Sequence, residues 1–82
     1  MNLRGMWLSW ADVEGFNGAC VIAQEDFLTA VKVANLLNIR PAKGGQCIGV
    51  LINFDLFKTA DTYRLLTAED CKRINSEEYI KL

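Results

Sequence analysis

The sequence of 82 residues contains no histidine, and this absence excludes several kinds of site. One chain without an imidazole cannot form a Ser-His-Asp triad, a Cys-His pair or a zinc site with histidine ligands. It also lacks the side chain that ordinarily changes charge near neutral pH. We therefore name no catalytic residue, no metal ligand and no cofactor, and the sequence favours a non-enzymatic protein.

Cysteine and proline are also scarce. The three cysteines, Cys20, Cys47 and Cys71, are widely spaced and odd in number, whereas a small secreted domain would have an even and denser set. We expect reduced, mostly buried thiols in a cytoplasmic protein. The single proline, Pro41, and a charged fraction of 23% argue against a disordered chain.

No apolar run approaches the 18 or so residues that a membrane-spanning helix needs. The short apolar segment after Arg4 is interrupted by Ser9 and Asp12, so we expect no signal peptide. The net charge is −1, which offers no general attraction for a phosphate backbone. We expect neither membrane nor nucleic acid as a partner.

The sequence is instead rich in apolar residues, which make up 51% of so short a chain. A 9.2 kDa monomer buries only about 63% of the surface of its unfolded chain. Some apolar surface should therefore remain exposed, and this predicts self-association as a homodimer or contact with a partner protein.

Two strands are predicted in the first third of the chain. Residues 6–11 have the aromatic content of a strand, residues 12–18 have the composition of a turn, and residues 19–23 are apolar at every position. The last pattern is typical of a central strand whose two faces are both covered.

A long helix is predicted for residues 25–38, with Glu25 and Asp26 in its first turn and Pro41 helping to end it. Its core-facing arc has six apolar members. They are Phe27, Ala30, Val31, Val33, Ala34 and Leu37.

Alternation over residues 47–56 predicts a third strand, whose even-numbered face is fully apolar and is expected to cover this helix. A turn at 58–62 and a short strand at 63–66 should follow. Thr67 and Asp70 have the spacing of a helix cap, which predicts a short helix to about Ile74. Residues 76–82 are compatible with either a helical turn or a strand.

These elements predict one α+β domain over residues 1–82. Its three- to four-stranded, mostly antiparallel sheet should carry the long helix on one face, with a short C-terminal helix. Acidic residues gather in the first third and basic residues in the middle third, and we expect the two groups to pair. Asp61 and Asp70 are typical of a turn and a helix cap rather than of a catalytic pair.

The loop from Arg40 to Gln46 is the most site-like segment, because it combines Arg40 and Lys43 with Gly44 and Gly45. Cations beside flexible glycines can hold a phosphate or a carboxylate. The loop follows a helix instead of preceding one, however, which favours a structural turn over a phosphate loop.

Two pairs of residues are candidates for an interface. Trp7 and Trp10 should point to opposite faces of an extended strand, so that one joins the core and the other meets solvent or a partner. Leu28 and Leu36 fall on the polar side of the predicted helix, two turns apart. Isolated exposed leucines are normal, but two in one row favour an interface.

Residues 18–49 resemble small α+β proteins of integron-type mobile gene cassettes and phage-like DNA. The resemblance is carried by the Gly18–Ala23 segment, Phe27-Leu28, Ile39-x-Pro41 and Gly44-Gly45, although those proteins have the glycines directly after the proline. It implies a compact domain, often dimeric, with an accessory role and no assigned activity. The leading hypothesis is thus a self-associating interaction module, and the alternative is an anionic-ligand binder or enzyme that uses the 40–46 loop.

Overall fold

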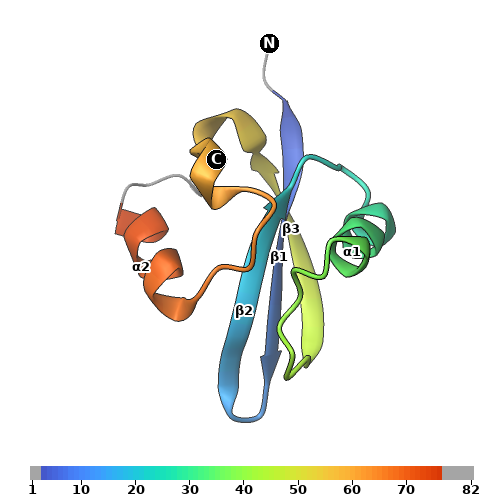
Figure 1. The fold of residues 1–82 in the computed structure, drawn as a ribbon. Coiled ribbons are helices and arrows are strands. Elements are labelled where there is room, and N and C mark those ends of the chain that lie inside the picture. Colours follow the sequence, from blue (N-terminus) through green and yellow to red (C-terminus); the bar gives the residue numbers. More distant parts are fainter. Residues whose placement is uncertain (1–2, 77–82) are drawn as a thin grey trace.

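The computed structural model describes residues 3–76 (Figure 1). The chain forms three strands, two α-helices and two short 3-10 turns. They are β1 (Arg4–Asp12), β2 (Gly15–Ile22), α1 (Phe27–Leu36), β3 (Gln46–Asn53), η1 (Phe54–Leu56), η2 (Thr59–Asp61) and α2 (Ala68–Ser76). The α+β class is confirmed, with three strands and a first helix of only 10 residues. Residues 77–82, whose conformation the sequence left open, lie outside the described part.

The strands form one antiparallel sheet in the order β2-β1-β3, so β1 is the central strand. The prediction that residues 19–23 form a central strand is therefore wrong. Its premise holds, because Ala19 to Ile22 are all buried. Layers above and below the sheet, rather than strands on both sides, cover this segment.

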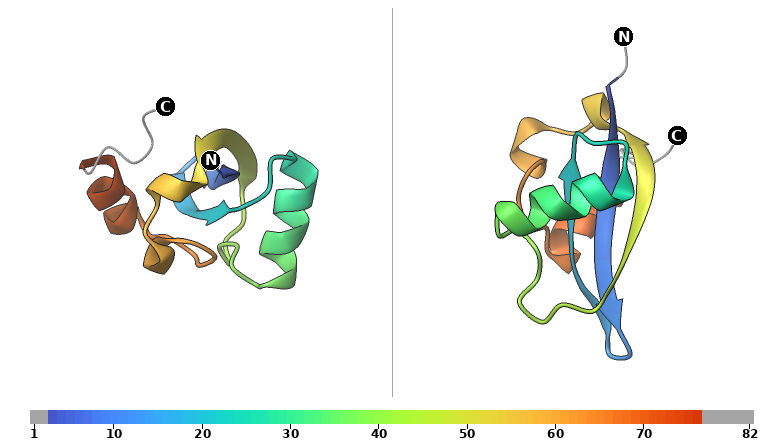
Figure 2. Two further views of the ribbon diagram at one scale, coloured as in Figure 1. Left: turned by 90° about the horizontal axis from the view of Figure 1, so that it is seen from above. Right: turned by 90° about the vertical axis from the view of Figure 1, so that its right-hand side faces the viewer.

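Helix α1 covers one face of the sheet, and the segment from η2 to α2 covers the other (Figures 1 and 2). Each layer closes its own apolar core, because alternate residues of a strand point to opposite faces. The core beneath α1 contains Met6, Leu8, Trp10, Cys20, Ile22, Ala30 and Ala34. The core on the other face contains Ala19, Val21, Ile52, Phe57, Leu66 and Ile74.

The hairpin between β1 and β2 turns more tightly than its composition predicts. The turn comprises only Val13 and Glu14, so β2 begins at Gly15 and includes residues assigned to a turn from sequence. The backbone N–H of Glu14 donates to Asp12 Oδ1 at 2.8 Å. The pairing of β1 with β2 shifts register at a bulge, because Trp10 pairs with Gly18 whereas the next residue, Ala11, pairs with Phe16.

Helix α1 is shorter than predicted at both ends. Asp26 is the N-cap residue and accepts hydrogen bonds from the backbone N–H and the hydroxyl of Thr29, both at 2.9 Å. At the other end Asn38 adopts a left-handed conformation with φ 55°. The N–H of Ile39 then donates to Ala34 O at 3.0 Å, which closes a Schellman motif. The helix thus ends well before Pro41, because asparagine tolerates this conformation.

Strand β3 ends at Asn53, and its even-numbered side chains face away from α1, contrary to prediction. Ile52 belongs to the core on the α2 side. It is Gly49 that lies beneath the helix, where an added Cβ would come within 2.6 Å of Phe27 Cδ1 and 2.8 Å of Met6 Sδ. The helix therefore packs where the strand has no side chain.

The C-terminal part keeps its predicted helix start but not its predicted strand. Asp70 Oδ2 accepts from the N–H and the hydroxyl of Thr67 at 3.0 and 3.1 Å, and Thr67 Oγ1 accepts from the N–H of Asp70 at 3.2 Å. In residues 63–66 only Leu66 forms a bridge, with Ala19. Over residues 3–76, neither helix has the length and apolar character needed to cross a membrane.

Candidate interaction surfaces and the 40–46 loop

The two edges of the sheet differ in how they are covered. The second half of the outer edge of β2 is bonded by the chain that follows β3: Val21 O accepts from the N–H of Tyr63 at 3.0 Å, and Ala19 and Leu66 exchange two backbone hydrogen bonds. Within the described residues, β3 pairs only with β1. Figure 2 shows β3 at the margin of the sheet, where no other described segment pairs with its outer side.

This open edge carries none of the features that usually protect an edge strand. Natural edge strands tend to contain lysine, proline or a bulge, which discourage pairing with another chain. The segment Gln46–Asn53 contains no charged residue and no proline. Three of its large apolar side chains are exposed: Ile48 by 59%, Val50 by 46% and Leu51 by 40%.

A hollow of about 590 Å³ lies beside this edge, on the face opposite α1. It is lined by Ser9, Ala11, Asp12, Val13, Gln46 and Ile48. Its one ionisable group is Asp12, whose pKa is lowered by hydrogen bonds from the Asn17 side chain and the Glu14 N–H. A single ionised carboxylate cannot supply an acid and a base together, so the hollow offers an apolar contact surface instead of a catalytic pair.

The outer face of α1 is the second uncovered apolar surface. Leu28 is 68% exposed and Leu36 is 85% exposed, which confirms that both lie on the solvent side of the helix. Leu37 was expected on the core-facing arc but is half exposed, because the helix ends at Leu36 and Leu37 is its C-cap residue. Lys32 lies between the two leucines and separates them.

The two tryptophans point to opposite faces of β1, as predicted. Trp10 is buried beneath α1. Trp7 is half buried on the other face, with its ring centroid 6.1 Å from that of Phe57. In the sheet register Trp7 lies opposite Val50, next to the exposed side chains of β3. Of the pair, only Trp7 is placed where a partner could reach it.

The 40–46 loop packs against the hairpin. Lys43 Nζ lies 3.2 Å from Glu14 Oε2 and 3.7 Å from Asp12 Oδ2, so the acidic and basic parts of the sequence do meet here. Asn17 Nδ2 donates to the carbonyl of Gly44 at 2.8 Å and to Asp12 Oδ2 at 3.0 Å. These contacts hold the loop against the hairpin. They also pair the ammonium group of Lys43, which an anionic ligand would need, with two carboxylates of the hairpin.

The two loop glycines are required by the backbone. Gly44 and Gly45 have φ values of 75° and 111°, which residues with a side chain rarely adopt. A Cβ on Gly45 would also lie 2.7 Å from the carbonyl oxygen of Ala11. Arg40 donates to Asn35 Oδ1 at 3.2 Å, back toward the helix. The four residues named from sequence as an anion site, Arg40, Lys43, Gly44 and Gly45, therefore lie near one another. The two glycines are explained by the backbone conformation of the loop.

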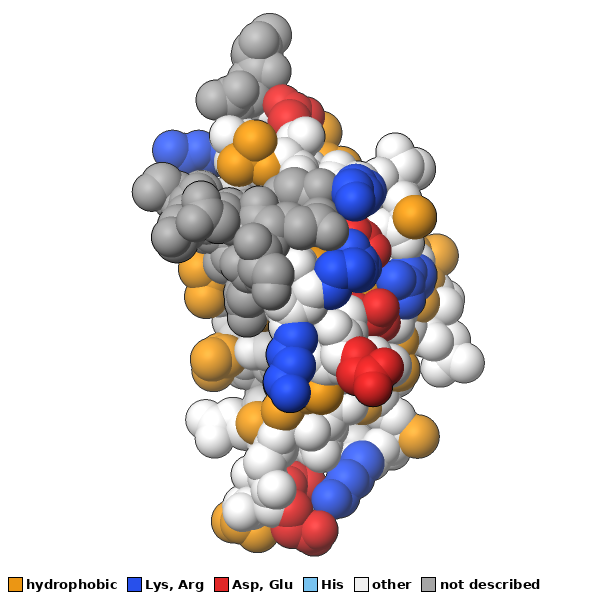
Figure 3. Space-filling model, turned by 90° about the vertical axis from the view of Figure 1, so that its left-hand side faces the viewer, with side chains coloured by type: hydrophobic (Ala, Val, Ile, Leu, Met, Phe, Trp, Pro, Cys, Tyr) orange, Lys and Arg blue, Asp and Glu red, His pale blue; other side chains and the backbone are white. Residues whose placement is uncertain are grey.

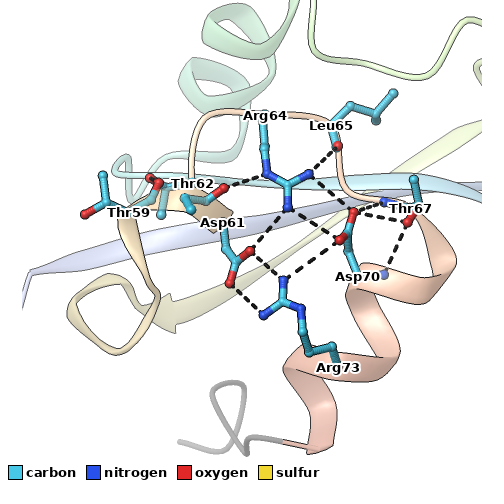
Figure 4. Close-up of polar contacts among 9 residues, drawn as sticks. Thr59, Asp61, Thr62, Arg64, Leu65, Thr67, Asp70 and Arg73 are labelled. Atoms are coloured by element: carbon cyan, nitrogen blue, oxygen red, sulfur yellow. Dashed lines mark hydrogen bonds and ion pairs between the residues drawn. The ribbon is translucent and has the colours of Figure 1, made fainter.

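An ion-pair network around the buried carboxylate of Asp61 was missed by the sequence reasoning. Asp61, expected as a turn residue, is only 2% exposed. It accepts from Arg73 Nη2 at 2.6 Å and Nη1 at 3.1 Å, and from Arg64 Nη2 at 3.3 Å (Figure 4). Arg64 also pairs with Asp70 at 3.3 Å. On this face of the molecule basic and acidic side chains alternate (Figure 3).

The network holds its carboxylates in the ionised form. Hydrogen bonds from Arg73 lower the pKa of Asp61, and those from Thr67 and then Arg64 lower the pKa of Asp70 to about 2. Neither group can act as a proton donor near neutral pH. The arrangement instead fastens η2 to α2.

The thiols offer no reactive site either. Burial raises the pKa of Cys20 to about 12 and that of Cys71 to about 11, and it also raises the pKa of Cys47. These groups stay protonated near neutral pH and are poor nucleophiles. Among residues 3–76, no three Cys, Asp or Glu side chains are grouped so that they could hold a metal ion.

Fold and surface thus define a small α+β domain with one open, uncharged sheet edge. The chain matches no protein-family model, and the searches of curated proteins and of solved structures gave no significant match.

Proposed function

We propose that the protein is a small, non-enzymatic interaction module that acts by self-association. The observation that carries this proposal is the uncharged β3 edge, along which the large apolar side chains of Ile48, Val50 and Leu51 are exposed. Leu28 and Leu36 form a separate exposed apolar surface on α1, where Lys32 lies between them. Exposed apolar side chains gathered along an unpaired sheet edge mark a site of protein contact.

The resemblance to mobile-cassette proteins supports the same proposal, since such proteins are often dimeric and have accessory roles. We infer a cytoplasmic location, because three free thiols persist under reducing conditions. A protein of the host is the other possible partner in such a role.

Self-association is favoured over the anion-binding alternative by the contacts of Lys43. Its ammonium group already pairs with Glu14 and Asp12. An anion bound there would have to displace these two carboxylates. Asn17 also donates to the carbonyl of Gly44, which holds the 40–46 loop against the hairpin as a structural turn.

Sedimentation equilibrium from low to high micromolar concentration tests the proposal. We expect the mass to approach twice that of the 9.2 kDa chain as the concentration rises. A protein that stays monomeric at high micromolar concentration would refute self-association.

The anion-binding alternative has its own test in thermal unfolding with inorganic phosphate and with dicarboxylates. A ligand at 100 times its dissociation constant adds about 2.7 kcal/mol to the free energy of unfolding, which would raise the melting temperature by several degrees. We expect no such shift beyond that of a chloride control at equal ionic strength.

A further inference from the structure

We propose that two copies of the chain pair their β3 strands antiparallel, around a two-fold axis, and so form one continuous six-stranded sheet. This inference rests on the proposed self-association and names the surface that carries it. The competing surface is the outer face of α1, with Leu28 and Leu36.

The first argument is the asymmetry of the sheet edges. An outer edge presents a row of backbone N–H and C=O groups that need partners. Residues 63–66 supply such partners along β2. No described segment does so along β3, which spans eight residues from Gln46 to Asn53. A second strand of equal length can bond this edge without any change in the fold.

The second argument is charge. A two-fold axis places β3 against itself, so a charged residue near the axis would face its own like charge, which destabilises a cross-strand pair. Charged residues make up 23% of the sequence, yet the β3 segment contains none. This composition fits a second copy better than it fits a partner chosen by complementary charge.

The third argument is the side-chain register. Residues that lie opposite each other in two paired strands point to the same face of the sheet. In β3 the even-numbered residues share one face and the odd-numbered residues share the other, so each even-numbered residue must pair with an even-numbered residue of the second copy, and each odd-numbered residue with an odd-numbered one. With Val50 opposite the partner's Val50, Ile48 falls opposite the partner's Ile52. Gly49 then falls opposite the partner's Leu51.

In that register, apolar side chains of the two copies meet on both faces of the sheet. Two isoleucine pairs (Ile48 with Ile52) and one valine pair come together on the face away from α1, and such pairs of β-branched residues stabilise a sheet. On the other face, the exposed Leu51 of one copy lies beside the Phe27 ring that covers Gly49 in the other copy. Centring on Gly49 instead would bring the two Phe27 rings toward each other.

The experiment substitutes the residue at the axis. In Val50→Lys or Val50→Glu, each homodimer would place two like charges directly opposite each other. We expect sedimentation equilibrium to give a monomer for either variant alone. An equal mixture of the two should restore a dimer, because the heterodimer then has one ammonium opposite one carboxylate.

The matched controls are Leu28→Lys and Leu36→Lys, which introduce the same charge at exposed leucines on α1. We expect both to remain dimeric. Far-UV circular dichroism and thermal unfolding establish that the Val50 variants are folded, which their restored pairing in the mixture would also demonstrate.

The outcomes separate this inference from the proposed function. A wild-type chain that is monomeric at high micromolar concentration refutes both. A wild-type dimer that survives Val50→Lys but dissociates in Leu28→Lys or Leu36→Lys retains self-association and overturns pairing through β3. Folded monomers of both Val50 variants that do not associate when mixed overturn the Val50-centred register.

Discussion

Replacement of Arg73 by methionine tests the role assigned to the buried carboxylate of Asp61. The Asp61 side chain is 3% exposed, and two of the hydrogen bonds it accepts come from Arg73. Hydrogen bonds to charged groups contribute about 1.5–3 kcal/mol each, and breaking a buried ion pair costs about 3–5 kcal/mol. The Arg73 side chain is 39% exposed, so water partly screens the pair, and Arg64 still pairs with Asp61. We therefore expect Arg73→Met to lower the free energy of unfolding by about 3 kcal/mol, the lower end of that range.

Arg64→Met is the matched comparison. Arg64 makes a single contact of 3.3 Å with Asp61, and its side chain is 44% exposed. Water therefore screens this ion pair, and exposed pairs contribute about 0–1 kcal/mol. Arg64 also contacts Asp70 at 3.3 and 3.4 Å, and its Nε donates to Ala60 O at 2.6 Å. We expect a loss of about 1–2 kcal/mol, smaller than that of Arg73→Met.

Urea unfolding followed by circular dichroism measures both losses. A domain of this size has a free energy of unfolding of roughly 4–12 kcal/mol, so 3 kcal/mol also lowers the melting temperature by more than about 10 °C. In the double variant Asp61→Asn/Arg73→Met the losses should fall well short of additive. The reasoning fails if Arg73→Met lies within about 0.5 kcal/mol of the wild type, or if Arg64→Met is the costlier change.

Three further changes have defined expectations. The pKa of Asp70 is about 2 in the folded protein, so its stabilising contribution is complete above its unfolded pKa of about 4 and is lost as the pH falls toward 2. Asp70→Asn should therefore reduce the pH dependence of the urea unfolding midpoint between about pH 4 and pH 2. Gly45→Ala should cost about 1–3 kcal/mol more in urea than Gly15→Ala, because both glycines have positive φ but only a Cβ on Gly45 meets backbone, that of Ala11. On association, tryptophan fluorescence should shift to the blue with rising concentration, and Trp7→Phe should abolish the shift.

The local features of the fold were predictable because their causes are local. The aromatic content of residues 6–11 indicated β1, and the continuous apolar residues 19–23 indicated the buried second half of β2. Side chains that bond the backbone a few residues away marked helix starts, as Thr67 and Asp70 do for α2. The exposure of Leu28 and Leu36 followed from helical periodicity alone.

The arrangement of these elements was not predictable in the same way. Continuous apolar residues in β2 indicate that both of its faces are covered. They do not indicate whether the strand is central in the sheet or lies at an edge between two covering layers. On β3 both faces are apolar enough to meet a helix, and Gly49 decides the matter by leaving room for Phe27. That effect depends on where α1 lies, which periodicity does not specify.

The candidate surfaces show the same division. The sequence named Leu28 and Leu36 as exposed residues and predicted that one of Trp7 and Trp10 is accessible, without choosing between the two tryptophans. Whether β3 lies at an edge depends on the strand order. The ion pairs of Asp61 were missed because its partner Arg73 is 12 residues away on another element. An aspartate in a turn is ordinary, and only the folded chain brings the two guanidinium groups to it.

The path of the chain after β3 explains why one edge is open and how many copies the open edge admits. Beyond Asn53 the chain leaves β3 through η1, crosses to the face opposite α1, and then bonds the outer edge of β2 with residues 63–66 (Figures 1 and 2). The same segment cannot also cover β3. An uncharged open edge on a monomer invites pairing with any other strand, and two open edges per molecule would allow filaments to grow. Antiparallel pairing of two β3 strands consumes the β3 edges of both copies. The β2 edge that then remains at each end of the six-stranded sheet is interrupted by its own chain at Ala19 and Val21, which opposes the addition of a further copy. This arrangement favours an assembly that ends at two copies.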